Sequence, residues 1–308
     1  MSDQHVIAAG GYEASVAGIG ATLRRLRYRG RDLVVPFGAG EERPDMRGAL
    51  LAPWPNRTAD GTYAFAGRTH RLPIDEPARR TANHGLVANL PFALLDRGAD
   101  RVVLAATLEP SDGYPWRLAV TVAVAVDAGG LTHEVEARNL SDTSAPLGLG
   151  VHPYLLAGLP AERAVDDWAL RLPAREAMLV TPDRLLPQRI VPVARHDGGS
   201  LDFREPRAIG PARLNHAFTA LRRDADGWAR ARLTAPGGEG VELAVDGAYR
   251  WLHAYTADEP SVGPPRAGVA IEPMTCPPDA LNSARDLLVV PPGGRVAAAF
   301  RIRGLDGA

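Results

Sequence analysis

Residues 117–126 read Arg-Leu-Ala-Val-Thr-Val-Ala-Val-Ala-Val, and this alternation decides the fold class. Every even-numbered position is Leu or Val, whereas the odd-numbered positions after Arg117 are Ala or Thr. Successive side chains of a β-strand point to opposite faces, so the pattern predicts a strand with bulky residues on one face and small residues on the other. Because both faces are largely apolar, we expect this strand to be covered on both sides, inside a sandwich or a closed sheet.

The residues that follow predict a β-hairpin. Asp127-Ala128-Gly129-Gly130 supplies turn residues, and residues 131–139 alternate again, with charged or polar side chains at every second position. Shorter segments of the same kind are found at residues 101–108, 231–234, 241–245, 249–255 and 295–303. The chain therefore reads as a series of short strands.

Frequent turn residues support one all-β domain. The 32 glycines and 27 prolines interrupt nearly every apolar segment before it could form a long helix. We find no sustained 3.6-residue apolar stripe, no internal repeat and no charged or low-complexity linker. The sequence therefore predicts a single domain over residues 1–308.

The charges point to an uncharged partner. The chain has 35 basic and 36 acidic residues and a formal net charge of -1, which gives no long-range field to attract nucleic acid or an anionic membrane. All 35 basic residues are arginine. Schiff-base enzymes, pyridoxal-phosphate enzymes and P-loop nucleotide binders need a lysine amine, so these classes are excluded. A neutral small molecule is the partner that we expect.

Cysteine usage and the apolar segments favour a cytoplasmic protein. Cys276 is the only cysteine, which excludes an intramolecular disulfide and a multi-cysteine zinc site. Residues 1–11 do not resemble a secretory signal. The longest apolar run, residues 118–126, is far shorter than the roughly 20 residues that span a bilayer. We therefore expect no membrane association.

Three residues stand out as candidates for chemistry. His84 lies between Asn83 and Gly85, just after a polar loop, and His152 follows an apolar stretch. Glu272 ends the apolar strand pattern that begins at residue 268. A carboxylate there costs free energy unless it is hydrogen-bonded or used in a reaction. Taken one at a time, each histidine could be a core residue bound to a carbonyl, and the glutamate could pair with an arginine.

Together, the three residues suit the opening of a cyclic hemiacetal. That reaction removes the proton of the anomeric hydroxyl and delivers a proton to the ring oxygen. A carboxylate can do the first and an imidazolium the second. Unperturbed pKa values of about 4.3 for Glu and about 6.5 for His would leave the base ionised and the acid partly protonated near neutrality. Such a reaction needs neither a metal nor an organic cofactor.

Two other uses of these residues remain open. His84, His152 and Glu272 could form a site in which two histidines and one carboxylate hold a metal, although such sites usually take two ligands from one short motif. Cys276 could be proposed as a nucleophile, but no base stands at a recognisable spacing. We interpret it as a small buried thiol.

Six motifs in order resemble the aldose 1-epimerase family. They are Pro53-Trp54-Pro55-Asn56-Arg57, Gly61-Thr62-Tyr63-Ala64-Phe65 with Gly67, Asn83-His84-Gly85, His152-Pro153-Tyr154, Leu214-Asn215-His216-Ala217-Phe218, and Ile271-Glu272-Pro273 with Asn282 beyond it. The likeness spans about residues 50–285. It implies a galactose-mutarotase-like fold, a large antiparallel β-sandwich, and an enzyme that interconverts the α and β anomers of an aldohexose.

The same resemblance assigns roles to residues. It implies Glu272 as the general base and His152 as the general acid at the ring oxygen, with His84 and Arg57 orienting the sugar. It further implies that Asn56 and Asn215 bind the sugar. Tyr154 and Trp251 are candidates for an apolar wall against the pyranose. Asn215 departs from the family pattern, in which many relatives carry an aspartate, and an asparagine can hydrogen-bond a hydroxyl but cannot carry charge.

The identity of the sugar is open at this point. The Pro-Trp-Pro-Asn-Arg motif resembles a bacterial branch that includes sulfoquinovose mutarotases, and a hexose 6-phosphate is a second anionic alternative. A non-catalytic sugar-binding module of the same fold is a further possibility, because fold does not dictate function. For assembly, the sequence is compatible with a monomer or a homodimer.

Overall fold

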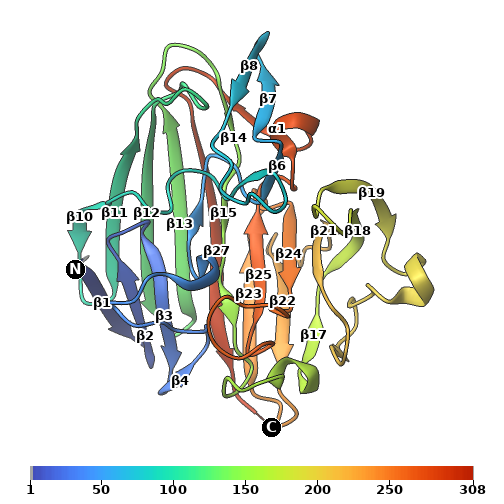
Figure 1. Cartoon of the computed structure of the whole chain (residues 1–308). Helices are drawn as coiled ribbons and strands as arrows, with labels where there is room; N and C mark the ends of the chain where they lie inside the picture. Colours follow the sequence, from blue (N-terminus) through green and yellow to red (C-terminus); the bar gives the residue numbers. More distant parts are fainter. Residues whose placement is uncertain (1–2, 308) are drawn as a thin grey trace.

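The predicted hairpin lies in the largest sheet of the protein. The structure is a computed structural model that describes residues 3–307, and its colours in Figure 1 follow the chain. Nine strands form this antiparallel sheet. In sheet order they are β10 (Ala93–Arg97), β11 (Arg101–Leu108), β12 (Leu118–Asp127), β13 (Gly130–Asn139), β27 (Arg295–Leu305), β23 (Gly240–Val245), β22 (Ala229–Thr234), β17 (Ala169–Arg171) and β20 (Arg207–Ala208).

Strand β12 confirms the expected alternation of side chains, but it is not covered on both faces as expected. Asp127 stands opposite Gly130 at the turn between β12 and β13, so the hairpin is confirmed. The Leu and Val positions of β12 are buried, whereas its Ala and Thr positions are only half-buried. The expectation of a strand covered on both faces was therefore wrong. Small side chains leave this face apolar without requiring a second layer on it.

The second large sheet has eight strands and carries most of the cleft described below. In sheet order they are β19 (Pro187–Pro192), β18 (Ala174–Val180), β21 (Asn215–Leu221), β24 (Trp251–Tyr255), β25 (Val269–Met274), β15 (Gly150–Val151) and β5 (Leu50–Leu51), with β16 (Tyr154–Leu155) paired to β25. All six residues of β25 are buried. Figure 1 shows β24 and β25 near the centre of the molecule and β18 and β19 at its right-hand side.

The two large sheets share one hydrophobic core. Val122 of β12, Phe218 of β21 and Ile271 of β25 belong to the same cluster of buried side chains. Burying a large apolar side chain stabilises the fold by roughly 1.5–3 kcal/mol relative to leaving it in water. Two sheets that bury their inner faces against each other form a sandwich. The predicted all-β class and antiparallel β-sandwich are confirmed.

Smaller elements complete the fold. A four-stranded sheet contains β1 (Gln4–Ala9), β2 (Tyr12–Ala17), β3 (Thr22–Tyr28) and β4 (Arg31–Asp32). Two-stranded ladders join β6 (Arg57–Ala59) to β9 (Thr81–Asn83), β7 (Thr62–Phe65) to β8 (Arg68–Arg71), and β14 (Ala145–Leu147) to β26 (Leu288–Val290). The helices are α1 (Ala280–Ser283) and three 3-10 turns at Pro44–Met46, Ala164–Asp167 and His196–Gly199. Within residues 3–307, no helix has the length and apolar character that a membrane crossing requires.

One buried carboxylate of the nine-stranded sheet is fully ion-paired. Glu242 of β23 is 3% exposed and stands directly opposite Arg232 of β22 on one side and Arg303 of β27 on the other. Its two oxygens lie 2.6 Å from Nε of Arg232 and 2.7 Å from Nε of Arg303. Burial opposes ionisation of Glu242, but the hydrogen bonds from the two arginines outweigh it and hold the pKa below its usual value.

Candidate active site

A cleft of about 750 Å³ is lined by residues of β18, β21, β24 and β25 and by loops that pack beside them. This volume is typical of small-molecule sites. Seven of the eight residues that the sequence put forward line it: His84, His152, Glu272, Arg57, Asn56, Asn215 and Tyr154. The sandwich therefore brings together side chains that are remote in the chain.

The register of β25 sets Glu272 between two histidines. His253 of β24 stands directly opposite Glu272 on one side. On the other side, Gly150 pairs with Met274 and Tyr154 with Ala270, so His152 stands at the level of Glu272. Glu272 is 1% exposed. The two-residue alternation of an antiparallel ladder thus places an imidazole on each flank of the carboxyl group.

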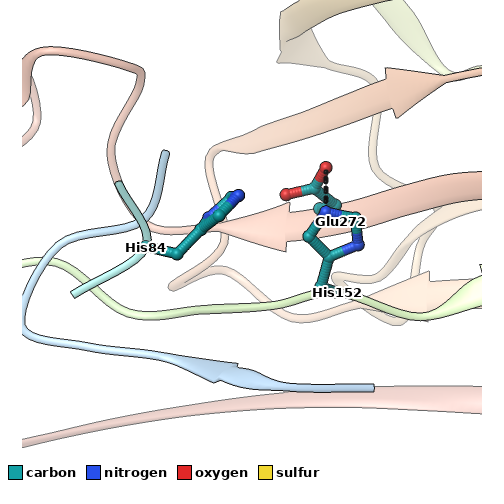
Figure 2. Close-up of side chains that lie close together, drawn as sticks. All are labelled: His84, His152 and Glu272. Carbon is teal, nitrogen blue, oxygen red and sulfur yellow. Dashed lines mark ion pairs between the residues drawn. The ribbon is translucent and has the colours of Figure 1, made fainter. Parts of the chain in front are cut away.

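Glu272 and His152 are in direct contact. Oε1 of Glu272 lies 3.2 Å from Nε2 of His152 (Figure 2). The second oxygen, Oε2, faces the side on which His84 lies. Neither Oε2 of Glu272 nor Nδ1 of His152 has a hydrogen-bond partner in the described part of the chain. Buried polar atoms without a partner are costly, and at a cleft they are available to a ligand.

Burial shifts both pKa values against the charged forms. It raises the pKa of Glu272 to about 8 and lowers the pKa of His152 to about 3. The expectation of an ionised base and a partly protonated acid near neutrality, which assumed unperturbed pKa values, was therefore wrong for this pair. Between the two values the pair holds a single proton, and burial keeps that proton on the carboxyl group. Moving it to His152 produces the carboxylate and the imidazolium without exchange with solvent.

His84 is held in a fixed orientation by Asn56. The backbone N–H of His84 donates to the carbonyl oxygen of Asn56 over 3.0 Å, and the backbone N–H of Asn56 donates to Nδ1 of His84 over 3.2 Å. Both residues have positive φ angles, 57° and 63°, a conformation that costs free energy outside glycine. Because Nδ1 accepts, the ring proton is on Nε2, and Figure 2 shows the ring extending toward Glu272 and His152. Burial lowers the pKa of His84, so the ring is a neutral donor.

The same three side chains have the composition of a metal site. One nitrogen from each of His84 and His152 and one oxygen of Glu272 lie within 4.8 Å of one another. Two imidazoles and a carboxylate suit a divalent transition metal. The metal interpretation considered from the sequence is therefore compatible with this geometry, and metal analysis of the purified protein distinguishes it from metal-free chemistry.

Every arginine that lines the cleft is paired with a carboxylate. Nε and Nη2 of Arg57 donate to the two oxygens of Glu76 over 2.7 and 2.9 Å, and Nε of Arg79 lies 3.1 Å from the same group. Nη2 of Arg213 lies 2.8 Å from Glu259. The positive charges of the cleft are thus largely neutralised by neighbouring acids.

Two further histidines line the cleft. His253 is 3% exposed, and its Nε2 lies 2.8 Å from Oδ1 of Asn215. A carbonyl oxygen can only accept, so the ring donates, and the Asn215 amino group stays free for another partner. His216 follows Asn215, and burial lowers its pKa to about 4. The sequence offered one signal for His253, namely its place in the strand pattern Trp-Leu-His-Ala-Tyr.

Of the two aromatic residues proposed to contact the sugar, Tyr154 lines the cleft and Trp251 does not. Tyr154 lines the cleft and stacks on the His152 ring with centroids 5.0 Å apart and an interplanar angle of 15°. Trp251 is 1% exposed in a cluster with Met178 and Met274, and its Nε1 donates to Asp286 over 2.9 Å. Trp251 is therefore corrected from a sugar-binding residue to a core residue. It shares the face of β24 that carries His253, but it lies two residues along the strand, where it packs against Met178 and Met274 instead of lining the cleft.

Cys276 lies in the core rather than in the cleft. It is fully buried, and burial raises the pKa of its thiol to about 12. A Cβ at Gly148 would lie 2.5 Å from its sulfur. A thiol that stays protonated is a poor nucleophile, which agrees with its interpretation as a small buried thiol.

Known proteins resemble this chain over most or all of its length. Among solved structures, a galactose mutarotase-like protein from Clostridium acetobutylicum superposes with a TM-score of 0.85 over 100% of this chain and 99% of that chain, at 17% identity. That likeness shows the fold. Human galactose mutarotase is 26% identical over 203 residues, which cover 62% of this chain and 57% of that protein.

Two further matches cover nearly all the strands of the sandwich. The uncharacterized protein YihR of Escherichia coli K12 is 33% identical over 301 residues, covering 97% of this chain and 92% of that protein. The family model described as aldose 1-epimerase matches residues 3–303, from the first strand to the last. With that match joined to the cleft geometry above, this chain belongs to the aldose 1-epimerase family.

Proposed function

We propose that this enzyme, an aldose 1-epimerase, interconverts sugar anomers with Glu272 as the base and His152 as the acid. The observation that carries this assignment is the contact of the two groups at 3.2 Å in a cleft where Oε2 of Glu272 has no protein partner among residues 3–307. A sugar hydroxyl that donates to Oε2 satisfies this atom. It also favours the carboxylate, which drives the shared proton onto His152.

Ring opening requires two proton transfers, one from the anomeric hydroxyl and one to the ring oxygen. Glu272 removes the proton of the anomeric hydroxyl while His152 delivers its proton to the ring oxygen, so that the bond between C1 and the ring oxygen breaks and an aldehyde forms. Rotation about the C1–C2 bond then presents the other face of the carbonyl. Glu272 then returns its proton to the carbonyl oxygen while neutral His152 takes the proton of the hydroxyl that was the ring oxygen, and the ring closes as the opposite anomer. His84 donates from Nε2 and orients the sugar at the ring-oxygen side.

We propose an uncharged aldose as the substrate. Arg57 and Arg79 share the carboxylate of Glu76, and Arg213 pairs with Glu259, so a phosphate or a sulfonate would have to compete with a carboxylate for each of these arginines. The Asn215 amino group supplies a donor for a sugar hydroxyl, since its oxygen is occupied by His253. Asn56 contributes indirectly, by holding His84 and by accepting the backbone N–H of Arg57 over 2.9 Å.

The experiment is polarimetry on freshly dissolved α-anomers of glucose, galactose, sulfoquinovose and glucose 6-phosphate. We expect Glu272→Gln to lower the catalysed rate by about 10² to 10⁴, the usual worth of one general acid–base group. Glu242→Gln is the matched control, because it changes a second buried glutamate outside the cleft. Equal rates for wild type and Glu272→Gln would remove Glu272 from its assigned role.

The sugar panel separates the alternatives. Faster turnover of sulfoquinovose or glucose 6-phosphate than of the neutral sugars would reveal an anionic substrate. In that case one of the cleft arginines would have to exchange its carboxylate partner for the substrate. A saturable affinity for sugar without any catalysed rate would identify a sugar-binding module instead. Loss of activity on chelation, restored by one metal, would favour the metal site.

The remaining expectations concern the protein as a whole. We propose that residues 1–308 form one domain, since a single core cluster includes side chains from Ile7 to Ile302. A cytoplasmic location and a monomeric or homodimeric state stay predictions from the sequence. Light scattering of the purified protein tests the oligomeric state.

A further inference from the structure

A second cavity, of about 600 Å³, lies apart from the catalytic cleft. It forms where the chain passes from β17 of the nine-stranded sheet to β18 of the eight-stranded sheet, through Leu172 and Pro173. Residues between 194 and 207 and the residue after β21 complete its wall. In Figure 1, β17 and β18 lie on the right-hand side of the molecule, whereas β25, which carries Glu272, lies nearer the centre.

The wall of this second cavity is strongly basic. Its positively charged residues are Arg171, Arg175, Arg204, Arg207 and Arg222. Its carboxylates are Asp202 and Glu205. Five guanidinium groups against two carboxylates make a local positive potential in a chain whose formal net charge is -1.

Three of the five arginines have partners in the protein. Nε and Nη2 of Arg204 donate to the two oxygens of Asp202 over 2.9 and 2.6 Å. The guanidinium of Arg207 lies 4.1 Å from the centre of the Phe203 ring and donates to the Ser200 carbonyl. Arg171 donates to a backbone carbonyl over 3.4 Å. Asp202 is thus committed to Arg204, and most of the positive charge in the cavity is not neutralised by it.

Arg175 and Arg222, both exposed, are the two of these five arginines whose guanidinium groups have no protein partner in the described part of the chain. Within residues 3–307, neither guanidinium forms a hydrogen bond or an ion pair. Their backbones are fixed nonetheless, because Ala174 pairs with Leu221 and the Arg222 N–H donates to the Pro173 carbonyl over 2.6 Å. The two side chains therefore start from adjacent, hydrogen-bonded segments of β18 and β21. Paired arginines on a fixed frame recognise tetrahedral oxyanions.

We propose that the second cavity is a binding site for a phosphate group, free or carried by a small molecule. The catalytic cleft has each of its arginines paired with a carboxylate and suits a neutral ligand, whereas the second cavity keeps two arginines unpaired and suits an anion. The inference does not rest on the proposed reaction, since no catalytic residue lines the second cavity. Strand β18 is common to both sites, with Arg175 in the second cavity and Val180 in the cleft.

The first test maps the site by chemical protection. The full chain is treated with phenylglyoxal, which modifies accessible arginines, and the modified positions are read by mass spectrometry. We expect inorganic phosphate or pyrophosphate at millimolar concentration to slow modification of Arg175 and Arg222 at least threefold, and to leave Arg68 unaffected. Sodium chloride at the same ionic strength should protect neither, because screening alone is not site-specific.

The second test measures affinity. Titration calorimetry with pyrophosphate should give a dissociation constant that weakens at least tenfold in Arg175→Gln/Arg222→Gln and stays unchanged in Arg68→Gln, an exposed arginine of the β7–β8 hairpin. The anomerisation rate of the double variant should equal that of the wild type, which shows that it folds. Equal affinity in the double variant, equal protection by chloride, or protection confined to Arg57 and Arg79 would each overturn the proposal.

Discussion

Glu242 and Glu272 are both glutamates at the centre of a sheet, exposed by no more than 3%, and they behave in opposite ways. Glu242 has an arginine opposite it on each neighbouring strand. Glu272 has a histidine at each corresponding place, His253 on β24 and His152 beside β15. Burial raises the pKa of Glu272, whereas the two arginines hold the pKa of Glu242 below its usual value.

The comparison teaches that the flanking residues decide what a buried carboxyl group can do. An arginine is always charged, so it fixes the negative charge of Glu242 and makes the group inert toward protons. A buried imidazole can be neutral or charged, so it leaves a proton that can move between itself and Glu272. One sandwich thus contains a structural carboxylate and a reactive one, built on the same three-strand pattern.

The largest expected effect comes from removing the imidazole that touches Glu272. We expect His152→Asn to lower kcat by about 10² to 10⁴ with KM nearly unchanged, because proton delivery to the ring oxygen is lost while most sugar contacts remain. His133→Asn is the control, since His133 is also buried but stacks on Phe300 far from the cleft lining. Steady-state polarimetry measures both. A variant with a changed KM and an unchanged kcat would show that His152 binds the sugar rather than transferring a proton.

The two glutamates should also differ in the sign of their effect on stability. At pH 8 we expect Glu272→Gln to raise the free energy of unfolding by about 1–3 kcal/mol, because it removes a carboxyl group that burial destabilises. Glu242→Gln should lower the same quantity by about 1–3 kcal/mol, because Arg232 and Arg303 lose a charged partner. Urea denaturation followed by circular dichroism measures both. If both variants changed the free energy of unfolding in the same direction, the contrast between the two glutamates would be contradicted.

The pH dependence of stability sharpens the contrast further. The folded pKa of Glu272, about 8, is above the value of 4.5 that the group has when unfolded, so the folded chain binds this proton more tightly. Stability linked to Glu272 is therefore lost as pH rises from about 4.5 to 8, by at most about 1.4 kcal/mol per pH unit. Repeating the urea series at pH 5, 6, 7 and 8 should show a flatter decline in Glu272→Gln than in wild type.

Glu242 should give the opposite slope. Its folded pKa is lowered, so its contribution is present above the unfolded value and is lost as pH falls through the folded value. The difference in unfolding free energy between wild type and Glu242→Gln should therefore shrink in acid, below about pH 4. A difference that grows in acid would contradict the role of the two arginines.

The smallest expected effect comes from placing a new carboxylate beside His253. Asn215→Asp removes the amino group that we assign to a sugar hydroxyl, and we expect KM for glucose to change by about 2- to 10-fold, the worth of one hydrogen bond. A negative charge 2.8 Å from Nε2 of His253 should also raise the pKa of that ring. The variant should therefore show an added ionisation in its profile of kcat/KM against pH. An unchanged KM and profile would place Asn215 outside the sugar-binding residues.

Much of the fold could be predicted from the sequence because alternation is a local property. Residues 117–130 predicted the hairpin of β12 and β13, and the segment at residues 101–108 coincides with β11. The half-buried second face of β12 could not be predicted, since whether a layer covers it depends on where distant strands go. The order of strands in each sheet likewise depends on pairings between remote segments.

The site was predictable in its residues but not in its contacts. Glu272 drew attention because a carboxylate ends an apolar strand, and the resemblance to a family supplied its partners. Its pKa could not be foreseen, because the shift depends on burial and on which neighbours are charged. His253 was missed because only the pairing of β24 with β25 shows that its side chain stands beside Glu272. Trp251 was misplaced because its burial against Met178 and Met274 depends on strands that are remote in the chain.

The rate at which Cys276 is labelled can report local opening between β25 and the segment before β15. The chain has one thiol, and it lies behind Thr275, which is tied to Leu149 by hydrogen bonds in both directions, over 2.8 and 2.9 Å. Because Cys276 is fully buried, we expect a thiol-reactive dye to reach it when this junction between β25 and the segment before β15 separates. Glu272 lies on β25 and His152 directly follows β15. A sugar that contacts both should therefore slow labelling of Cys276, so that the labelling rate reports occupancy of the cleft without following the reaction.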